Sequence, residues 1–387
     1  MKKFFAAVLA VCLSISVFPF FNPSVLAGVQ PEITAKSAIL IDAVSGEVLY
    51  EKNPHEKLPP ASVTKVMTML MVMEAIDAGQ ITFGDTVTIN EEAANMGGTQ
   101  LFLEVGETRT VEELMYGVAV ESGNDAATAL GVKLGGSVTG FVEKMNARAK
   151  ELGMDDTHFE DACGLTAENH YTSAYDIALM SRELISHPDI FKFLTTWMID
   201  VNVGKNNDKL RTLANTNKLL RQRDYIDGIK TGYTAEAGHC ISATGKSGDL
   251  RLISVIMHGT DSKTRFEEAD ALLQYGFSQY QAVFPVKSGD TVGELHLYNA
   301  QKESIPLIVK ENVYQLMKKD AAANIEKELI LEEEYRYAPV AADEKVGELV
   351  VKSGETEIAR MEVFTAEQAD KISFSQYLKF IKKYLLP

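Results

Sequence analysis

A serine and a lysine stand three residues apart at the head of a long apolar run, and this stretch sets strong limits on the fold. Pro59 and Pro60 come before it, and Ser62 and Lys65 follow. Proline is tolerated only ahead of a helix or in its first turn, so Ser62 is expected on that turn. Residues i and i+3 of a helix share one face, about 5 to 6 Å apart at Cβ, so the Lys65 amine can reach the Ser62 hydroxyl.

The run from Val66 to Met73 has almost no polar face, as expected of a helix that is buried on all sides. A lysine at the head of such a helix loses its hydration, which favours the neutral amine. A neutral amine is a base, and a base beside a serine can make the hydroxyl a nucleophile without histidine. The same residues also fit a capped core helix whose lysine extends towards solvent, so the rest of the chain has to decide.

Residues 1–27 have the pattern of an export signal. Lys2 and Lys3 precede an apolar run over 4–17, and a small residue, Ala27, ends the segment. The run is shorter than the roughly 20 residues of a membrane span, and prolines follow it closely. We therefore expect an exported protein that works outside the cytoplasm.

Composition excludes several classes of function. The 387 residues carry a formal net charge of -16, which argues against nucleic acid as a partner. After the signal only Cys163 and Cys240 remain, too few for a disulfide framework, and we expect both to be free and buried. The chain has no CxxC, no HExxH and no Cys/His cluster, so neither a metal nor another cofactor is expected.

The order of the predicted elements describes an α+β protein. Two strand-like runs flank a turn at Val44–Gly46 just before the Ser62 helix, and an antiparallel meander is predicted later in the chain. This order favours an antiparallel sheet with helices packed on it and a helical subdomain inserted. The predicted meander strands are 225–233, 237–244 and 250–258, and the predicted helices include 111–120, 126–134, 138–152 and 269–280.

Beyond about Phe284 the chain changes to short strand-like runs and turns, which predicts a small β-rich domain that serves as a spacer or a protein contact. The tail after Lys371 places aromatic and leucine side chains on one helical face and lysines on the other, the pattern of a helix lying in a membrane interface. A helix docked on its own domain is the alternative. The predicted divisions are a signal peptide over 1–27, a main domain over 28–283, a β-rich domain over 284–370 and an anchoring helix over 371–387.

Two further motifs can complete a peptidase site. Ser122 and Asn124 offer a hydroxyl and an amide between two predicted helices, although a helix cap with a turn explains them equally well. Lys230 and Thr231 alternate on a predicted edge strand and offer a cation and a hydroxyl to a carboxylate, while Gly232 leaves room for a peptide. Three other Lys-Ser-Gly triplets, at 246–248, 287–289 and 352–354, are expected to be turns.

The three motifs come in the order Ser62, Ser122 and Lys230, with gaps of 60 and 108 residues. In this order and spacing they resemble the signature of penicillin-binding proteins and serine β-lactamases. The strings around Ser62 and Lys230, and the stretch His170–Asp176, are similar to low-molecular-mass D-alanyl-D-alanine carboxypeptidases, especially those of Gram-positive spore-forming bacteria. The resemblance covers the chain from about Gln30 to its end. It implies a β-lactamase/transpeptidase-like fold, a small all-β domain and an amphipathic tail.

The resemblance also implies a mechanism. Ser62 attacks the carbonyl of the penultimate D-alanine in a peptidoglycan stem peptide, the terminal D-alanine leaves, and water clears the acyl-enzyme. Lys65 acts as the base, and Ser122 and Lys230 relay protons or tune the field. β-Lactam antibiotics acylate the same serine.

The substrate-binding roles follow from the same resemblance. Asn124 holds the lysine and the substrate amide, and Lys230 and Thr231 take the terminal carboxylate. Gly232 gives the peptide access to the strand. The backbone N–H groups of the nucleophilic serine and of Tyr233 form the oxyanion hole.

Two other functions remain as alternatives. A serine β-lactamase of class A has a glutamate for deacylation and usually an aspartate in its second motif, whereas this chain has Gly123 there and no matching glutamate loop. A catalytically silent sensing module is disfavoured because the motif residues are intact. Cys240 could lie near the cleft but reads better as a core thiol, and the lysine-based arrangement leaves His170 and His239 without an obvious catalytic task.

Overall fold

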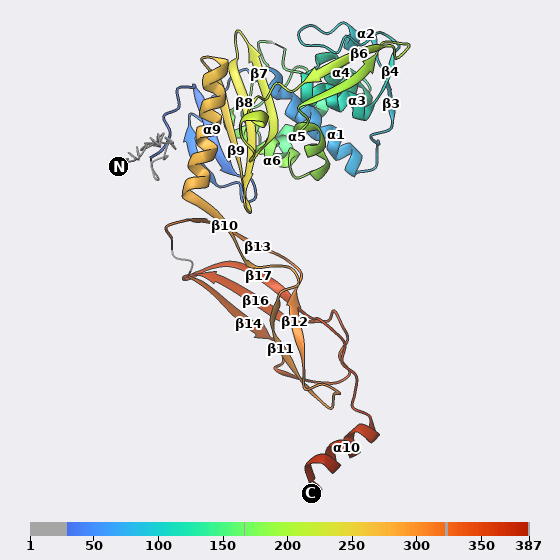
Figure 1. Ribbon diagram of the computed structural model, residues 1–387, viewed down its shortest axis with the longest axis vertical. Coiled ribbons are helices and arrows are strands. Elements are labelled where there is room, and N and C mark those ends of the chain that lie inside the picture. Colours follow the sequence, from blue (N-terminus) through green and yellow to red (C-terminus); the bar gives the residue numbers. More distant parts are fainter. Residues whose placement is uncertain (1–28, 166, 322–323, 386–387) are drawn as a thin grey trace, which may run out of the picture.

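The computed structural model describes residues 29–165, 167–321 and 324–385. The predicted export signal falls outside these residues. The described chain forms a larger domain of mixed helices and strands, an elongated β domain below it, and a helix at the far end (Figure 1). This arrangement has the predicted α+β class.

A five-stranded antiparallel sheet lies at the centre of the larger domain, in the order β2-β1-β9-β8-β7. The predicted hairpin supplies β1 and β2, and the predicted meander supplies the other three strands. Strand β7, which carries Lys230, forms one edge of the sheet as expected. The bounds are β1 Ser37–Asp42, β2 Val48–Lys52, β7 Ile226–Thr234, β8 Gly238–Ser247 and β9 Leu250–Gly259.

Helices cover both faces of this sheet, so strand β1 is buried along its whole length (Figure 1). Because side chains alternate along a strand, Leu40 packs in one hydrophobic cluster with helix α9, while Ile39 packs in another with α1 and α6. The bounds of these helices are α1 Lys65–Asp77, α6 Ala174–Leu184 and α9 Ser262–Gln279.

Helix α9 begins earlier than the predicted 269–280. The Asp261 side chain caps it by accepting hydrogen bonds from the backbone N–H groups of Lys263 and Thr264. Its first two turns consist mostly of polar residues, so they show no apolar periodicity in the sequence. The capping residue Asp261 was the sequence signal that could have indicated where α9 begins.

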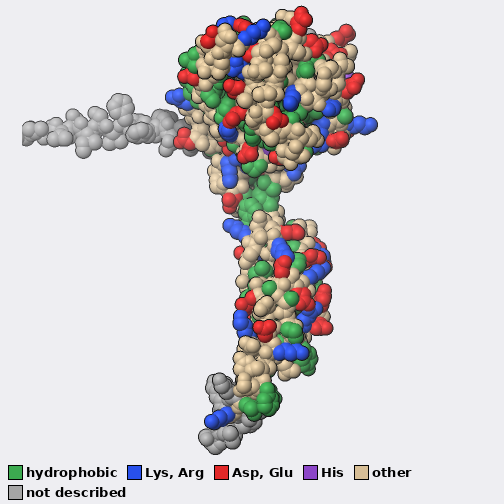
Figure 2. Space-filling model, turned by 90° about the vertical axis from the view of Figure 1, so that its right-hand side faces the viewer, with side chains coloured by type: hydrophobic (Ala, Val, Ile, Leu, Met, Phe, Trp, Pro, Cys, Tyr) green, Lys and Arg blue, Asp and Glu red, His purple; other side chains and the backbone are tan. Residues whose placement is uncertain are grey.

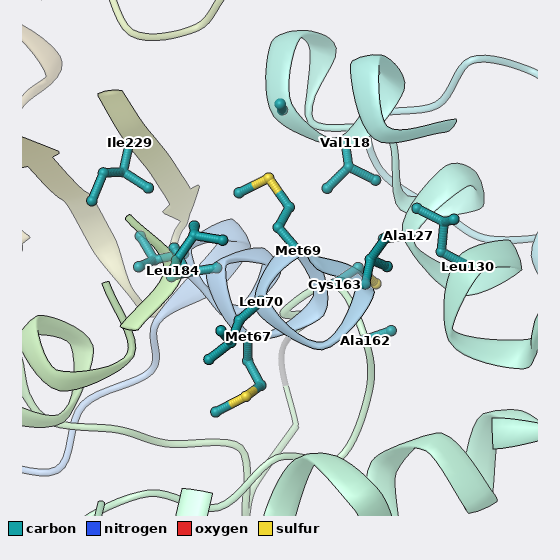
Figure 3. Close-up of a cluster of buried hydrophobic side chains, with 14 of the residues drawn as sticks. Met67, Met69, Leu70, Val118, Ala127, Leu130, Ala162, Cys163, Leu184 and Ile229 are labelled. Atoms are coloured by element: carbon teal, nitrogen blue, oxygen red, sulfur yellow. The ribbon is translucent and has the colours of Figure 1, made fainter. Parts of the chain in front are cut away.

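A helical lobe surrounds α1, which has buried side chains on all sides as predicted. Figure 3 shows Met69 on the side of this helix that faces Val118, and Met67 and Leu70 on its other side. The lobe contains α2 Glu91–Ala94, α3 Val111–Tyr116, a π-helical turn Gly117–Glu121, α4 Asn124–Gly135 and α5 Val138–Glu151. Nearby lie an antiparallel strand pair, β3 Thr86–Thr88 with β4 Thr108–Thr110, and a hairpin, β5 Met198–Val203 with β6 Lys209–Ala214. The same region contains a 3₁₀ turn Pro188–Ile190, α7 Phe191–Leu194 and α8 Leu219–Gln222.

The β domain has a hydrophobic core of its own, to which Val286, Leu307 and Val351 belong. Its first strand follows α9 directly, and Tyr314 Oη donates a 2.7 Å hydrogen bond to Asp42 Oδ1 of the larger domain. Strand β10 Tyr280–Val286 pairs with β13 Val313–Lys318. The six-stranded sheet has the order β14 Ile325–Leu331, β16 Lys345–Ser353, β17 Thr356–Thr365, β12 Ser304–Val309, β11 Thr291–Tyr298 and β15 Tyr335–Tyr337.

Helix α10, Phe374–Leu385, lies at the end of the molecule opposite the larger domain (Figures 1 and 2). Phe374 is 77% exposed, and Tyr377 and Leu378 are each 49% exposed. Among the described residues, none of the helices has the length and apolar character that a bilayer crossing requires.

Candidate active site

Ser62 lies on a 3₁₀ turn, η1 Ala61–Thr64, that leads directly into α1. Lys65 is the first residue of the helix, and its Nζ lies 2.9 Å from Ser62 Oγ. The predicted contact between the two side chains is therefore present. It arises from their spacing of three residues on one helical turn.

The Lys65 amine is enclosed by oxygen atoms and has no exposed surface. Its Nζ donates to Asn124 Oδ1 at 2.7 Å and to the backbone carbonyl of Cys163 at 2.9 Å. Burial lowers the pKa of Lys65 to about 8, although the negative charge of Asp161 and Asp125 opposes the shift. A substantial fraction of this lysine is thus neutral near pH 8.

Ser122 and Asn124 lie where the π-helical turn ends and α4 begins. Ser122 has a left-handed backbone with φ 70° and is nearly buried, and α4 starts at Asn124. The Asn124 Nδ2 atom donates to the Gly97 carbonyl at 2.6 Å, which fixes the amide so that its oxygen faces Lys65. The described hydrogen bonds join Lys65 to Asn124 but not to Ser122.

Strand β7 runs directly against the turn that carries Ser62. A Cβ atom on Gly232 would lie 3.0 Å from the Ser62 backbone nitrogen and 2.8 Å from the Pro60 carbonyl, so only glycine allows this approach. Lys230 is buried, and its Nζ donates to the Thr231 carbonyl at 3.0 Å.

Three neighbouring side chains of β7 lie in different surroundings. Burial, with the positive charges of Lys65 and Arg265, lowers the pKa of Lys230 well below its ordinary value. Thr231 Oγ1 donates to Thr216 Oγ1 at 2.7 Å. The Tyr233 ring is 60% exposed and stacks on His239 with 4.4 Å between ring centroids.

The three predicted motifs therefore meet at one place. Ser62, Lys65 and Asn124 are joined by hydrogen bonds, and Gly232 brings the Lys230 strand against the serine. The other Lys-Ser-Gly triplets end in glycines with positive φ at Gly248, Gly289 and Gly354, as expected of turns.

The sequence analysis did not identify the Cys163 carbonyl, which accepts a hydrogen bond from Lys65. Its loop is shaped by the Asp161 carboxylate, which accepts hydrogen bonds from the N–H groups of Cys163, Gly164 and Leu165. A backbone carbonyl leaves no side-chain pattern to detect. The thiols agree with the prediction, because Cys163 and Cys240 are both free and buried, and burial raises the pKa of each to about 12 and about 11.

His170 has a structural task that the sequence did not suggest. Its Nδ1 accepts a 3.2 Å hydrogen bond from the Glu160 N–H, which leaves the Nε2 proton to face Thr64 Oγ1 at 2.9 Å. Burial lowers the pKa of His170, which keeps the ring neutral as this pairing requires. The ring therefore ties the Asp161 loop to the turn that carries Ser62.

Arg265 was also missed. This nearly buried cation donates from Nη1 to the Gly232 carbonyl at 2.9 Å and to the Cys240 carbonyl at 3.1 Å. It supports β7 from behind at the position nearest to Ser62. Arg265 was not identified because it lies in the polar first turn of α9, a segment that was not expected to be helical.

Replacing Gly232 by alanine is expected to reduce acylation by penicillin about 100-fold while the protein stays folded. The new Cβ would meet backbone atoms of the turn that carries Ser62, so β7 and this turn must separate, and a misplacement near 1 Å can cost that much. Labelling rates with fluorescent penicillin measure the effect. Gly84→Ala is the control, because its only near neighbour is a side-chain oxygen at 4.0 Å; equal rates in the two variants would contradict the prediction.

The fold, with a serine-lysine pair facing an edge strand of an antiparallel sheet, is that of the penicillin-binding class of serine enzymes. A family model described as D-alanyl-D-alanine carboxypeptidase, peptidase S11, matches residues 25–261, and one described as Penicillin-binding protein 5, C-terminal domain, matches residues 280–371. The chain belongs to the peptidase S11 family of D-alanyl-D-alanine carboxypeptidases, as the sequence motifs indicated.

Relatives of this family are similar over most of their length. D-alanyl-D-alanine carboxypeptidase DacF of Bacillus subtilis is 41% identical over 345 residues, which are 89% of this chain and 88% of the relative. The structure of penicillin binding protein 5 from Haemophilus influenzae is 31% identical, with a TM-score of 0.68 over 89% of this chain and 99% of that one. Penicillin-Binding Protein D2 from Listeria monocytogenes in its ampicillin-bound form is 31% identical, with a TM-score of 0.57 over 64% of this chain and 99% of that one.

Proposed function

We propose that this chain removes the terminal D-alanine from peptidoglycan stem peptides that end in D-Ala-D-Ala, with Ser62 as the nucleophile. The observation that carries the assignment is the 2.9 Å approach of Lys65 Nζ to Ser62 Oγ, together with a lysine pKa lowered to about 8 by burial. Family membership supports the reaction. The geometry supports the roles of the individual residues.

The surroundings of Lys65 favour its action as a base. A neutral amine has two N–H donors and one lone pair, and two oxygens that can only accept, Asn124 Oδ1 and the Cys163 carbonyl, take the two donors. The lone pair is left for the third neighbour, the Ser62 hydroxyl, which then donates its proton to Lys65. The amine is thus oriented before substrate arrives.

The reaction proceeds in two steps. As Ser62 Oγ bonds to the carbonyl carbon, its proton passes to Lys65 and then, with help from Ser122 and Lys230, to the amine of the departing D-alanine. Water next bonds to the same carbon, the ester bond breaks, and a proton returns to Ser62. The backbone N–H groups of Ser62 and Tyr233 stabilise the oxyanion in both steps.

Strand β7 binds the end of the substrate. A peptide that lies along this edge strand brings its terminal carboxylate to Lys230 and Thr231, while Asn124 holds its amide. Arg265 keeps β7 in place through the Gly232 carbonyl and adds a second positive charge behind the strand. The carboxylate favours the charged form of Lys230, which burial otherwise disfavours.

β-Lactams are proposed to acylate the same serine, since the related Listeria protein has been solved with ampicillin and with cefotaxime. The test incubates the protein with a peptide ending in D-Ala-D-Ala and, in parallel, with labelled penicillin. Release of D-alanine and a lasting label on the Ser62 peptide are expected. Rapid turnover of penicillin would instead favour a β-lactamase, and a label without D-alanine release would favour a silent sensing module.

The location and the anchor are part of the same proposal. The relatives of this protein belong to a family of cell-wall enzymes. We infer that residues 1–27 direct export and that the mature chain acts outside the cytoplasm. Helix α10 is proposed to lie in the membrane interface, because Phe374, Tyr377 and Leu378 are exposed although they are apolar or aromatic. The proposed divisions remain 28–283 for the catalytic domain and 284–370 for the β domain.

Ending the chain at Ser373 is expected to release the protein from membranes without changing hydrolysis of a soluble peptide. The cut removes α10 and leaves every residue of the site, so kcat/KM should stay at the wild-type value. Flotation with lipid vesicles measures the first effect and D-alanine release the second. If the shortened protein floats with vesicles as the full chain does, α10 is not the membrane anchor.

A further inference from the structure

The β domain carries four exposed rings side by side on the solvent face of its sheet, here called the tyrosine ladder: His296, Tyr298, Tyr335 and Tyr337. Tyr335 stacks on His296 at 5.4 Å and on Tyr298 at 5.2 Å between centroids, and Tyr298 lies 5.2 Å from Tyr337. The exposed fractions of the three tyrosines are 47% for Tyr298, 49% for Tyr335 and 70% for Tyr337. Such a continuous exposed aromatic surface indicates a binding partner.

The backbone explains how the ladder forms. Strands β11 and β15 pair in parallel with His296 opposite Tyr335 and Tyr298 opposite Tyr337. Side chains alternate along each strand, so these four rings share the outer face while Leu295 is buried below. Since β15 is an edge strand, the ladder lies at a border of the sheet.

The ladder ends next to the start of α10. The Ala338 N–H donates to the Tyr298 carbonyl at 3.0 Å, and the Ile372 N–H donates to the carbonyl of the following residue, Asn299, at 2.8 Å. Phe374, the first residue of α10, comes two residues after Ile372, a span of at most about 7 Å. Any surface to which α10 binds therefore also lies close to Tyr298.

The geometry points to a lipid surface, and we propose that the tyrosine ladder is a second contact of this protein with an anionic bilayer, beside α10. The proposal rests on the membrane role proposed for that helix. A single weak anchor gives only reversible attachment, and stable binding takes two contacts. Tyrosine suits the second contact, because its ring is apolar and its hydroxyl stays hydrated at the headgroup level.

The way the rings stack argues against a sugar as the occupant. Both faces of Tyr335 are taken by its neighbours His296 and Tyr298, with interplanar angles of 25° and 20°. A sugar that stacks on an aromatic side chain needs an open ring face. Tyr337, the most exposed ring of the ladder, is left free to insert between lipid headgroups.

The charges around the ladder agree with a bilayer at the α10 end. At the α10 end, Lys302 lies in the turn that follows β11 and pairs with Glu367, and Lys371 follows Asp370 in the segment that leads to α10. Three glutamates, 332–334, come before β15 and so lie at the opposite end of the ladder, where Arg336 pairs with two of them. The sequence of α10 itself contains Lys379, Lys382 and Lys383, and this basic charge favours an anionic surface.

A tryptophan at position 337 tests the contact directly. The chain has one tryptophan, Trp197 in the larger domain, so Trp197→Phe gives a silent background for Tyr337→Trp. Vesicles of phosphatidylglycerol and phosphatidylethanolamine should shift its emission to the blue, and brominated lipid should quench it. Ile330→Trp in the same background is the control, because Ile330 is 44% exposed on β14, the opposite edge of the sheet.

Vesicle affinity provides a second measurement. Changing Tyr298, Tyr335 and Tyr337 to serine is expected to weaken vesicle binding of the full chain roughly tenfold or more, while Ile330→Ser leaves it unchanged. Unchanged affinity of the triple variant, or no emission shift at position 337 when the protein is bound, would overturn the ladder contact. A shift caused by purified glycan strands instead of vesicles would also overturn it.

The outcomes separate this inference from the proposed anchor. If the chain ended at Ser373 binds vesicles as the full chain does, the role of α10 fails whatever the ladder does. If α10 is required and the triple variant binds normally, only the ladder contact fails. Catalysis of a soluble peptide should be unaffected in every variant, because none of these residues lies in the site.

Discussion

Replacing Ser62 by alanine is expected to abolish both D-alanine release and penicillin labelling. The hydroxyl oxygen is the proposed nucleophile, so the loss in kcat should approach the roughly 10⁶-fold loss that follows removal of a serine nucleophile from a hydrolase. The fold should survive, since the side chain loses one oxygen at the edge of the cleft. Release of D-alanine measures turnover, and mass spectrometry after penicillin treatment measures acylation.

A matched control is Ser186→Ala, in which an exposed serine whose hydroxyl donates only to the Glu183 carbonyl is removed. This variant should keep wild-type activity. Penicillin that still labels the Ser62→Ala protein would show that another residue is the nucleophile. The labelled peptide would then identify it, with Ser122 as the first place to look.

Replacing Lys65 by methionine is expected to slow acylation by about 10²- to 10⁴-fold, the usual contribution of a general base. Methionine fills the same buried space but has no lone pair on nitrogen to accept the Ser62 proton. Arginine at the same position should be as inactive, because it stays protonated. Lys205→Met, which removes an exposed lysine, is the control for a change of net charge.

The pH dependence of acylation tests the same base in the unmodified protein. Burial lowers the pKa of Lys65 to about 8, and the proposed base is the neutral form of this lysine. The acylation rate should therefore rise about tenfold per pH unit below that pKa and level off above it. A rate that falls as the pH rises towards 8 would contradict a lysine base.

The contact between Ser62 and Lys65 could be predicted because it depends on local spacing along one helical turn. The apolar run after it also predicted that the lysine would be buried. The place of Lys230 on an edge strand was also predicted, from the alternation of its strand-like run. These features share a property, since each depends on side-chain type and on periods of two or of three to four residues.

Other parts of the site could not be predicted, because they depend on backbone atoms or on contacts between distant segments. The Cys163 carbonyl and the tie from His170 to Thr64 exist only once the Asp161 loop has folded over α1. The hairpin of β5 and β6 was missed because its exposed positions weaken the alternation of apolar residues. Arg265 was missed because the start of α9 has no apolar periodicity.

The β domain holds the larger domain away from α10, and strand β10 joins the two without a linker. The Tyr314–Asp42 hydrogen bond braces this junction. If α10 lies on the lipid as proposed, Ser62 is held at a nearly constant height above the membrane. The proposed anchor then implies that only wall peptides at that height are trimmed, so a change in the length of the β domain would alter which part of the wall is processed.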